Sequence, residues 1–304
     1  MGRPVRLFQP EGCYFVTARC FQARLLLRPS AETNEVVGGT LAQALLLYRV
    51  QLFAFVVASN HLHLLVRAPD GNLPVFMQYL LANIARKVGR LVGWRGALWE
   101  RRYSAEPVLD NEAMVGRLRY ILSHGVKEGL VRRCAEWPGL SCLAQLLGDA
   151  VRLFHWFDWT SRWKASPREP DPKTLLDKRW ARLVALEVQP LPCWGSLSQQ
   201  QRRARVSELV DAIEQDRSLS RKSVLGRKRI LNQRPHERPR EVKRTPRPLC
   251  HASSSEAREG FRELYRSFLA KFKEASRRWR AGQLRVEFPR FAIRPFLWPS
   301  AAPA

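Results

Sequence analysis

The pattern of apolar and polar residues in the first half of the chain predicts strands that alternate with helices. Residues 13–19 alternate aromatic and small side chains, as a strand does, and residues 35–50 carry apolar side chains at helical spacing. Residues 52–58 form a continuous apolar run, so we expect a buried central strand there. The turn signal Ser59-Asn60 follows, and residues 61–67 predict a second strand antiparallel to the first.

The same patterns predict three further elements before residue 125. Residues 73–92 repeat apolar side chains every three or four positions, which indicates an amphipathic helix. Residues 98–108 predict a strand, and Asp110 or Asn111 can cap a helix that runs to about His124. The resulting order is strand, helix, strand, strand, helix, strand, helix. It predicts an α+β fold with a ferredoxin-like antiparallel sheet and packed helices.

The second half of the chain predicts a basic, mainly α-helical C-terminal extension. Helical spacing suggests four segments, at 175–188, 198–216, 219–233 and 255–281, and Pro-rich sequence at 167–173 suggests a link before the first of them. We therefore expect four parts: an α+β domain at 1–148, a basic helical region at 149–233, an extended Pro/Arg-rich linker at 234–254, and a basic helix with a tail at 255–304.

The charge of the chain points to a polyanionic partner. The 304 residues are 45% hydrophobic, which is enough for a full core, yet 52 Lys and Arg against 27 Asp and Glu leave a net charge of +25. Residues 1–150 hold 18 basic and 11 acidic residues (net +7), and residues 151–304 hold 34 and 16 (net +18). Such an excess favours nucleic acid as the partner, and a solvated basic surface is the alternative.

Two further features bear on the cellular setting. No stretch reaches the ~18 continuous apolar residues of a membrane span, and the first ten residues lack the apolar run of a signal peptide, so we expect a cytoplasmic protein that associates with the nucleoid through DNA and not with membranes. The six cysteines form no CxxC pair. This spacing argues against a zinc knuckle and against a disulfide framework.

A pair of histidines in one predicted strand suggests a metal site. Successive side chains in a strand alternate faces, so His61 and His63 project from one face while Leu62 and Leu64 enter the core. Two imidazoles on one face can share a metal ion. The pair alone is weak support, because imidazoles often serve as ordinary polar residues.

Three segments extend this pattern: Asn60-His61-Leu62-His63-Leu64-Leu65-Val66, Arg119-Tyr120-Ile121 and Lys127-Glu128-Gly129-Leu130-Val131. In these segments the chain resembles the single-tyrosine HUH transposases, and in particular the transposase-like proteins associated with repetitive extragenic palindromes. The resemblance covers about residues 1–148. It implies that His61 and His63 are metal ligands and that Tyr120 is the catalytic nucleophile.

The resemblance also implies a reaction and its requirements. Tyr120 would attack a phosphate of single-stranded or hairpin DNA, form a 5′-phosphotyrosine and release a 3′-hydroxyl. A phenol with a pKa near ~10 is a poor nucleophile at neutral pH, so a divalent cation, Mg²⁺ or Mn²⁺, is expected to assist, without a nucleotide cofactor. The family contains monomers and homodimers, and both remain open for this chain.

The chain departs from the family pattern after the tyrosine, where His124-Gly125 replaces the usual Asn-Pro. Position 124 lies four residues after Tyr120, on the same helix face, in the slot that the family is thought to use for a third metal ligand. A third imidazole would shift the preference from Mg²⁺ towards Mn²⁺ or softer transition metals. The alternatives are that His124 is a cation at a helix terminus and that Tyr120 is an ordinary core ring.

Further basic and aromatic residues are candidates for DNA binding. The predicted helix 73–92 and strand 98–108 supply these candidates: Arg86, Lys87, Arg90, Arg101, Arg102 and Tyr103. They could equally be solvated cations and a core ring.

Two alternative functions remain beside the strand transferase. One is a domesticated, catalytically inactive nucleic-acid-binding protein. The other is a replication initiator or relaxase, which would normally carry further domains or a second nearby tyrosine that the sequence does not show.

Overall fold

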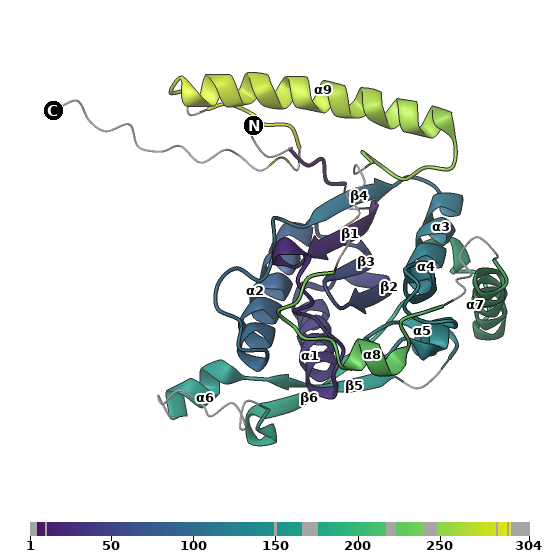
Figure 1. Ribbon diagram of the computed structural model, residues 1–304. Helices are drawn as coiled ribbons and strands as arrows, with labels where there is room; N and C mark the ends of the chain where they lie inside the picture. The colour runs from purple at the N-terminus through teal and green to yellow at the C-terminus, as the bar shows by residue number, and fades with distance from the viewer. Residues whose placement is uncertain are drawn as a thin grey trace.

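A four-stranded antiparallel sheet forms the centre of the protein (Figure 1). The computed structural model describes residues 5–9, 11–148, 151–165, 176–216, 223–239, 248–283, 285–290 and 292. The sheet has the strand order β2-β3-β1-β4 and consists of β1 (Cys13–Arg19), β2 (Gln51–Ala58), β3 (His61–Arg67) and β4 (Ser104–Val108). Every neighbouring pair in it is antiparallel.

Helices cover both faces of this sheet. Helices α1 (Ala31–Tyr48) and α2 (Leu73–Leu91) pack against each other on one face, and α3 (Asn111–Leu122) and α4 (His124–Lys127) lie on the other (Figure 1). The chain order β1-α1-β2-β3-α2-β4, with β1 and β3 in the centre, is that of a ferredoxin-like unit. The predicted α+β class and ferredoxin-like sheet are confirmed.

Local sequence signals explain where several of these helices begin and end. The Ser30 hydroxyl accepts a hydrogen bond from the backbone N–H of Thr33 and caps α1, and the Asp110 carboxylate caps α3 in the same way through Ala113. Gly93 follows α2 with a φ of 63°, a conformation that glycine adopts without strain. The Asp110 cap was predicted from the sequence, and the predicted bounds of α2 and α3 are close to the observed ones.

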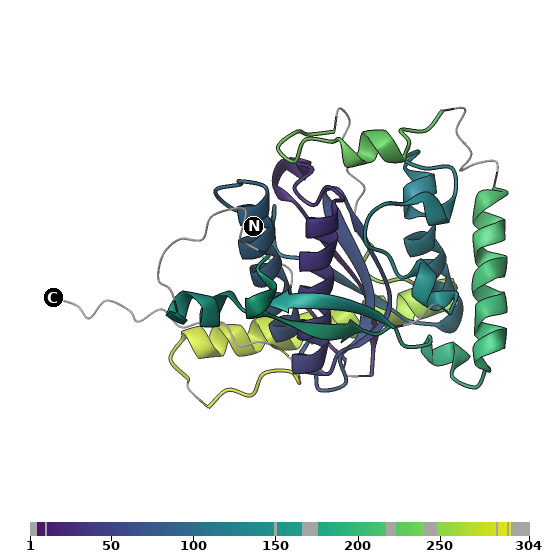
Figure 2. The same cartoon turned by 90° about the horizontal axis from the view of Figure 1, so that it is seen from below.

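A two-stranded hairpin from the second half of the chain packs on α1. It consists of β5 (Arg152–Phe157) and β6 (Ala181–Leu186), and it crosses α1 on the side away from the sheet (Figure 2). Gly38 permits this approach, since a Cβ there would lie 2.5 Å from the Phe154 ring. The Glu35 carboxylate accepts hydrogen bonds from the His155 backbone N–H at 2.6 Å and from its Nδ1 at 2.7 Å.

The hairpin corrects one prediction. Helical spacing favoured a helix at 175–188, but β6 occupies 181–186 after a short 3-10 helix, η4 (Lys178–Trp180), while residue 175 lies outside the described residues. The segment is rich in Leu, Ala and Arg, which are good helix formers. Pairing with β5 overrides that weak local preference.

The strand predicted at 98–108 is also shorter than expected. Only Ser104–Val108 pairs continuously with β1, and Trp99 forms one isolated bridge to Cys20. Between these two contacts four residues, 100–103, oppose only two residues of β1, so the extra ones loop out. Arg101 and Arg102 therefore lie on an exposed turn instead of in the strand.

The remaining helices agree in part with the predictions. Helices α7 (Gln199–Glu214) and α9 (Ser255–Arg280) confirm the segments predicted at 198–216 and 255–281, and Ser198 and Ser254 cap them. Of the helix predicted at 219–233, the described part contains only α8 (Arg227–Leu231). The short elements are α5 (Leu143–Leu146), α6 (Trp159–Ala165), η1 (Phe21–Ala23), η2 (Cys134–Glu136) and η5 (Pro192–Trp194).

The segment predicted as a linker is anchored at both described ends. The Leu25 N–H donates to the Glu237 carbonyl, and the His251 N–H donates to the Pro107 carbonyl beside β4. Residues 240–247 of this segment, and the Pro-rich link at 167–173, lie outside the described residues. The division into four parts stays a prediction.

Two general features complete the fold. The cysteines are free thiols, and all except the half-buried Cys193 are buried. Among the described residues, no helix combines the length and the apolar character needed to cross a bilayer.

Candidate metal and nucleophile site

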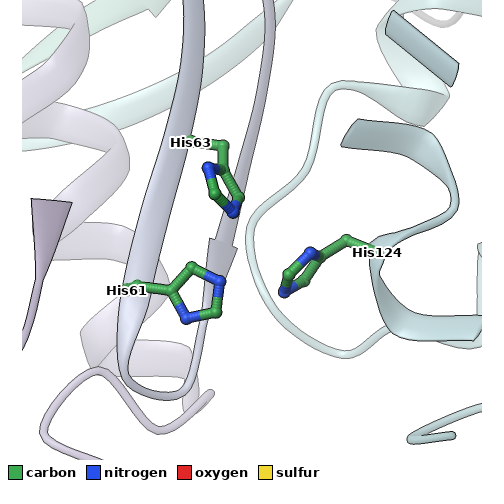
Figure 3. Close-up of side chains that lie close together, drawn as sticks. All are labelled: His61, His63 and His124. Atoms are coloured by element: carbon green, nitrogen blue, oxygen red, sulfur yellow. The ribbon is translucent and has the colours of Figure 1, made fainter. Parts of the chain in front are cut away.

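Three histidines meet between the sheet and the helices α3 and α4 (Figure 3). His61 and His63 point from β3 towards His124, which begins α4, and one ring nitrogen from each lies within 4.8 Å of the others. The ring centroids are 4.8 Å apart for His61 and His63, 4.7 Å for His61 and His124, and 5.2 Å for His63 and His124. The structure thus brings together the three residues that were predicted as ligands.

Local geometry explains why these side chains meet. Alternation along β3 places His61 and His63 on the face that α3 covers, while Leu62 and Leu64 are buried on the other face. Helix α3 ends at Leu122, earlier than predicted, but the Ser123 N–H still donates to the Arg119 carbonyl. His124 therefore remains about one turn beyond Tyr120.

Two neighbouring side chains orient the strand histidines. Asn60 Oδ1 lies 2.6 Å from His61 Nδ1, and the Thr17 hydroxyl lies 2.9 Å from His63 Nδ1. When each Nδ1 carries the proton and donates to these oxygens, each Nε2 presents a lone pair. Metal-ligating histidines are usually held in this way by a hydrogen bond at the second ring nitrogen. Sequence spacing did not identify Thr17, which faces His63 only through the pairing of β1 with β3.

The buried nitrogens of this cluster fit a metal ion. His63 Nε2 and His124 Nδ1 are shielded from solvent and have no hydrogen-bond partner among the described residues. Such an unsatisfied group costs roughly 1–3 kcal/mol, and coordination of a cation would remove that cost. The described residues thus contain a set of imidazole ligands suited to a metal ion.

Burial also determines the charge of these histidines. It lowers the pKa of His124 to about 4, with smaller contributions from the nearby cations Lys127 and Arg19. It lowers the pKa of His61 and of His63 well below the usual value as well. All three imidazoles are therefore neutral at pH 7, which is the form that binds metals. A neutral, buried His124 contradicts the alternative that it is a cation at a helix terminus.

Tyr120 lies at the edge of the histidine cluster. Its ring centroid is 5.4 Å from that of His63 and 6.1 Å from that of His124. Two cations lie over the same ring, Arg117 at 5.2 Å and the Lys127 ammonium at 4.3 Å from its centroid. Burial raises the pKa of the Tyr120 phenol, and Arg117 acts in the opposite direction.

A buried acid and a fourth histidine lie near the nucleophile, and sequence reasoning missed both. Glu106 Oε2 is 3.8 Å from His251 Nε2, and the His251 ring meets Phe15, whose ring is 5.6 Å from that of Tyr120. Glu106 faces this side because it opposes Phe15 in the pairing of β1 with β4. His251 reaches it from 145 positions further along the chain, which local patterns cannot reveal.

The predicted DNA-binding residues lie elsewhere. Lys87 is buried and donates a hydrogen bond of 2.8 Å to the Phe157 carbonyl, so it is not available to a phosphate. Tyr103 is 6% exposed beneath Arg6, so its ring is not available to an unpaired base. Arg86 and Arg90 are exposed on α2, on the sheet face opposite to the histidines.

Comparison with known proteins supports the resemblance seen in the motifs. No protein-family model matches the chain. A Haemophilus influenzae protein named “Putative REP-associated tyrosine transposase” is 26% identical over 102 residues, which are 30% of this chain and 58% of that protein. The chain thus matches little more than half the length of this relative.

Two solved structures align with parts of the chain. One is a REP-associated tyrosine transposase bound to a REP hairpin, with a TM-score of 0.43, 17% identity, and coverage of 48% of this chain and 86% of that one. The other, described as a “putative transposase” from Deinococcus radiodurans, has a TM-score of 0.28, 20% identity, and coverage of 40% and 95%. Both scores are too low to add to the sequence match. That match confirms the resemblance: the chain is similar to the REP-associated tyrosine transposases.

Proposed function

We propose that this protein is a metal-dependent endonuclease and strand transferase that acts on hairpin-containing single-stranded DNA through a 5′-phosphotyrosine at Tyr120. The observation that carries this proposal is the meeting of three neutral imidazoles with one tyrosine, in a cluster that leaves buried nitrogen lone pairs unsatisfied. The similarity to REP-associated tyrosine transposases supports the choice of substrate.

Each side chain of the site has a part in this mechanism. His61, His63 and His124 hold the ion, and Asn60 and Thr17 keep the strand imidazoles in the ligating tautomer. A bound divalent cation, Mg²⁺ or Mn²⁺, supplies Lewis-acid polarisation of a non-bridging phosphate oxygen.

The phenol oxygen of Tyr120 forms the new bond to phosphorus. The bond from phosphorus to the 3′ oxygen breaks, and that oxygen leaves as a hydroxyl with a proton from solvent, while the phenol proton is released. Arg117 and Lys127 lie over the ring and stabilise negative charge on the phenolate and on the phosphate. Burial raises the pKa of this tyrosine and opposes its ionisation, and the charge of Arg117 acts in the opposite direction.

The geometry of the site also argues against the alternative that the protein is catalytically inactive and only binds nucleic acid. A protein that only binds nucleic acid has no need to keep two buried, unsatisfied imidazole nitrogens beside a tyrosine, because each such group destabilises the fold. We therefore favour turnover over loss of activity. His124, where the family usually has an amide, changes the ligand type without removing it.

A covalent adduct tests this function directly. The wild-type protein, incubated with Mn²⁺ or Mg²⁺ and a library of single-stranded hairpin oligonucleotides, should form a protein–DNA species that survives denaturation. Tyr120→Phe should abolish the species because the phenol oxygen is the nucleophile, and EDTA should do the same. Tyr79→Phe, on a half-buried tyrosine of α2, is the matched control and should leave it unchanged.

Two results would count against this proposal. One is the absence of an adduct with the wild-type protein across the whole library. The other is an adduct that persists in Tyr120→Phe, which would place the nucleophile elsewhere.

A further inference from the structure

A pocket lies between α2, the end of β5 and α6, away from the histidine cluster. Its volume is about 260 Å³, and its walls carry three tryptophans and several cations, of which these carry the argument: Trp156, Trp159, Trp163, Arg86, Arg90 and Arg162. Helix α2 covers the sheet face opposite to α3 and α4, so this pocket is not part of the candidate metal and nucleophile site (Figure 1). The proposed function does not use it.

Cations lie over the faces of two tryptophan rings in this pocket. The Lys87 ammonium is 4.8 Å from the centroid of Trp156, and the Arg90 guanidinium is 5.0 Å from that of Trp159. These contacts hold both rings in place through cation–π attraction. Trp163 is 54% exposed, which is unusual for the largest apolar side chain and is typical of a residue that contacts a ligand.

The polar groups of the pocket favour an anion. Arg86, Arg90 and Arg162 line it together with one acid, Asp158. The Asp158 carboxylate accepts hydrogen bonds from the backbone N–H groups of Thr160 and Ser161 and from the Ser161 hydroxyl, so its charge serves to cap α6. The cations are thus in excess, and guanidinium groups bind phosphate oxygens in pairs.

We propose that this pocket binds one unpaired nucleotide of a single-stranded nucleic acid, with the base stacked on tryptophan and the adjacent phosphates held by arginine. Flat aromatic faces beside guanidinium groups are the usual recognition surface for an unpaired base and its backbone. The volume is slightly below the roughly 300–1,000 Å³ of typical small-ligand pockets, which suits a single base and excludes a folded hairpin.

The inference rests on the proposed function for the identity of the nucleic acid, and it adds a second contact point on that substrate. Because the pocket and the nucleophile lie on opposite faces of the sheet, the bound nucleotide is remote from the scissile phosphate. The pocket would therefore hold an unpaired segment that flanks the cleaved position, and it would contribute to affinity without contributing to the chemical step.

Binding in the absence of cleavage tests this site. The full chain carrying Tyr120→Phe is titrated, without metal, against a fluorescent single-stranded oligonucleotide. Trp163→Ala should weaken binding by about 5- to 100-fold, the range expected for the loss of one base–aromatic stack. Trp163→Phe should retain most of the affinity, because it keeps an aromatic face. Trp163 is exposed, so its truncation leaves the core intact.

A charge variant and a cross-link extend the same test. Arg86→Ala should weaken binding, whereas Arg205→Ala, an equally exposed arginine on α7 at the other end of the molecule, is the matched control (Figure 2). An oligonucleotide with 5-iododeoxyuridine should cross-link on irradiation to the peptide of residues 152–165.

The outcomes separate this proposal from the proposed function. Full affinity in both Trp163→Ala and Arg86→Ala, or cross-links that map only outside residues 152–165, would overturn the nucleotide pocket even if the Tyr120 adduct forms. Conversely, weakened binding and the expected cross-link without any Tyr120 adduct would uphold the pocket while the strand-transfer proposal fails. Equal losses in Trp163→Phe and Trp163→Ala would also contradict stacking.

Discussion

At the scale of single residues, His124 decides whether the proposed metal site has a third ligand. A ring nitrogen of His124 lies within 4.8 Å of a ring nitrogen of each strand histidine. Its Nδ1 is buried and has no hydrogen-bond partner among the described residues. A third imidazole ligand would make the proposed site softer than a site with an amide ligand. Imidazoles prefer transition metals, whereas amide and carboxylate oxygens suit Mg²⁺.

We expect His124→Asn to move metal preference towards Mg²⁺. The variant restores an oxygen ligand, so affinity for Mn²⁺ relative to Mg²⁺ should fall, while His124→Ala should weaken the binding of both ions. Calorimetric titration of the purified protein with each ion measures this ratio. His236→Asn, an exposed histidine, serves as the control. An unchanged ratio in His124→Asn would mean that this residue does not ligate.

The buried histidines also predict how stability depends on pH in the metal-free protein. The folded-state pKa of His124 is lowered to about 4, below its unfolded value, so the unfolded chain binds more protons between these values. The stability that the neutral, buried His124 contributes is therefore fully present above about pH 6.5 and is lost as the pH falls towards 4. Each such histidine contributes a slope of at most about 1.4 kcal/mol per pH unit.

Urea denaturation with EDTA at pH 7.5, 6, 5 and 4.5 measures this dependence. His124→Asn removes one titrating group, so its stability should fall less steeply with pH than that of the wild type, while His236→Asn should follow the wild type. Identical slopes in all three proteins would show that His124 is not buried as a neutral group.

At the scale of elements, α1 is buried both by the sheet and by the hairpin β5-β6. Glycine in the middle of a helix is unfavourable by roughly 0.5–1 kcal/mol relative to alanine. Gly38 and Gly39 nevertheless lie side by side in α1, because a Cβ on Gly39 would overlap the His155 carbonyl oxygen and one on Gly38 would overlap the Phe154 ring. The two glycines thus lower the helix propensity of α1 but allow the hairpin to pack closely against it.

Gly39→Ala should therefore destabilise the protein in spite of its better helix propensity. We expect a loss of about 2 kcal/mol or more, because the new methyl group meets backbone atoms that cannot rotate away. Gly260→Ala in α9, where a Cβ has no neighbour within 4 Å, should instead stabilise by about 0.5–1 kcal/mol. Denaturant titration gives both values, and equal effects of the two substitutions would contradict the close packing of the hairpin.

At the scale of the whole molecule, most of the positive charge lies beyond the ferredoxin-like sheet. Residues 151–304 carry a net charge of +18, and α9 alone presents exposed arginines and lysines along its length. Just before α9, the chain runs beside the sheet, since His251 pairs with Val108 at the end of β4. The segment that leads into α9 is therefore held against the sheet that carries the candidate site.

Salt dependence should reveal the part that α9 takes in DNA binding. Replacing Arg262 and Arg266 by Ser should weaken single-stranded DNA binding and reduce the slope of log affinity against log salt by about 0.7 for each lost phosphate contact. Arg205 and Arg234, exposed arginines outside α9, replaced in the same way, remove the same net charge. If both double variants lower the slope equally, α9 makes no specific contact.

Local sequence patterns were sufficient to predict many of the strands and helices. The period of apolar residues identified β1, β2, β3, α2, α3, α7 and α9, because each buries one face or a continuous run, and the capping residue Asp110 located the start of α3. The spacing of His61 and His63 placed them on one face, since alternation is a property of the strand itself. The resemblance to the transposases pointed to Tyr120 and to position 124, which helical spacing places on the same face.

Contacts between segments that are far apart in the sequence could be identified only in the tertiary structure. Pairing with β5 made residues 181–186 a strand despite their helical composition, and the backbone register beside β1 moved Arg101 and Arg102 out of β4. Burial of Lys87 beneath Phe157 and the approach of His251 to Glu106 are likewise set by packing partners 70 and 145 positions away.

The sequence by itself determined the class of fold, because periodicity is local, and its short motifs suggested the three histidines and the tyrosine through their resemblance to the single-tyrosine transposases. Only the folded chain decided which of these groups are buried, neutral and held by Asn60 and Thr17, and which cations are exposed. The physical reason is that desolvation and hydrogen bonding depend on every neighbour in space, and those neighbours come from all parts of the chain.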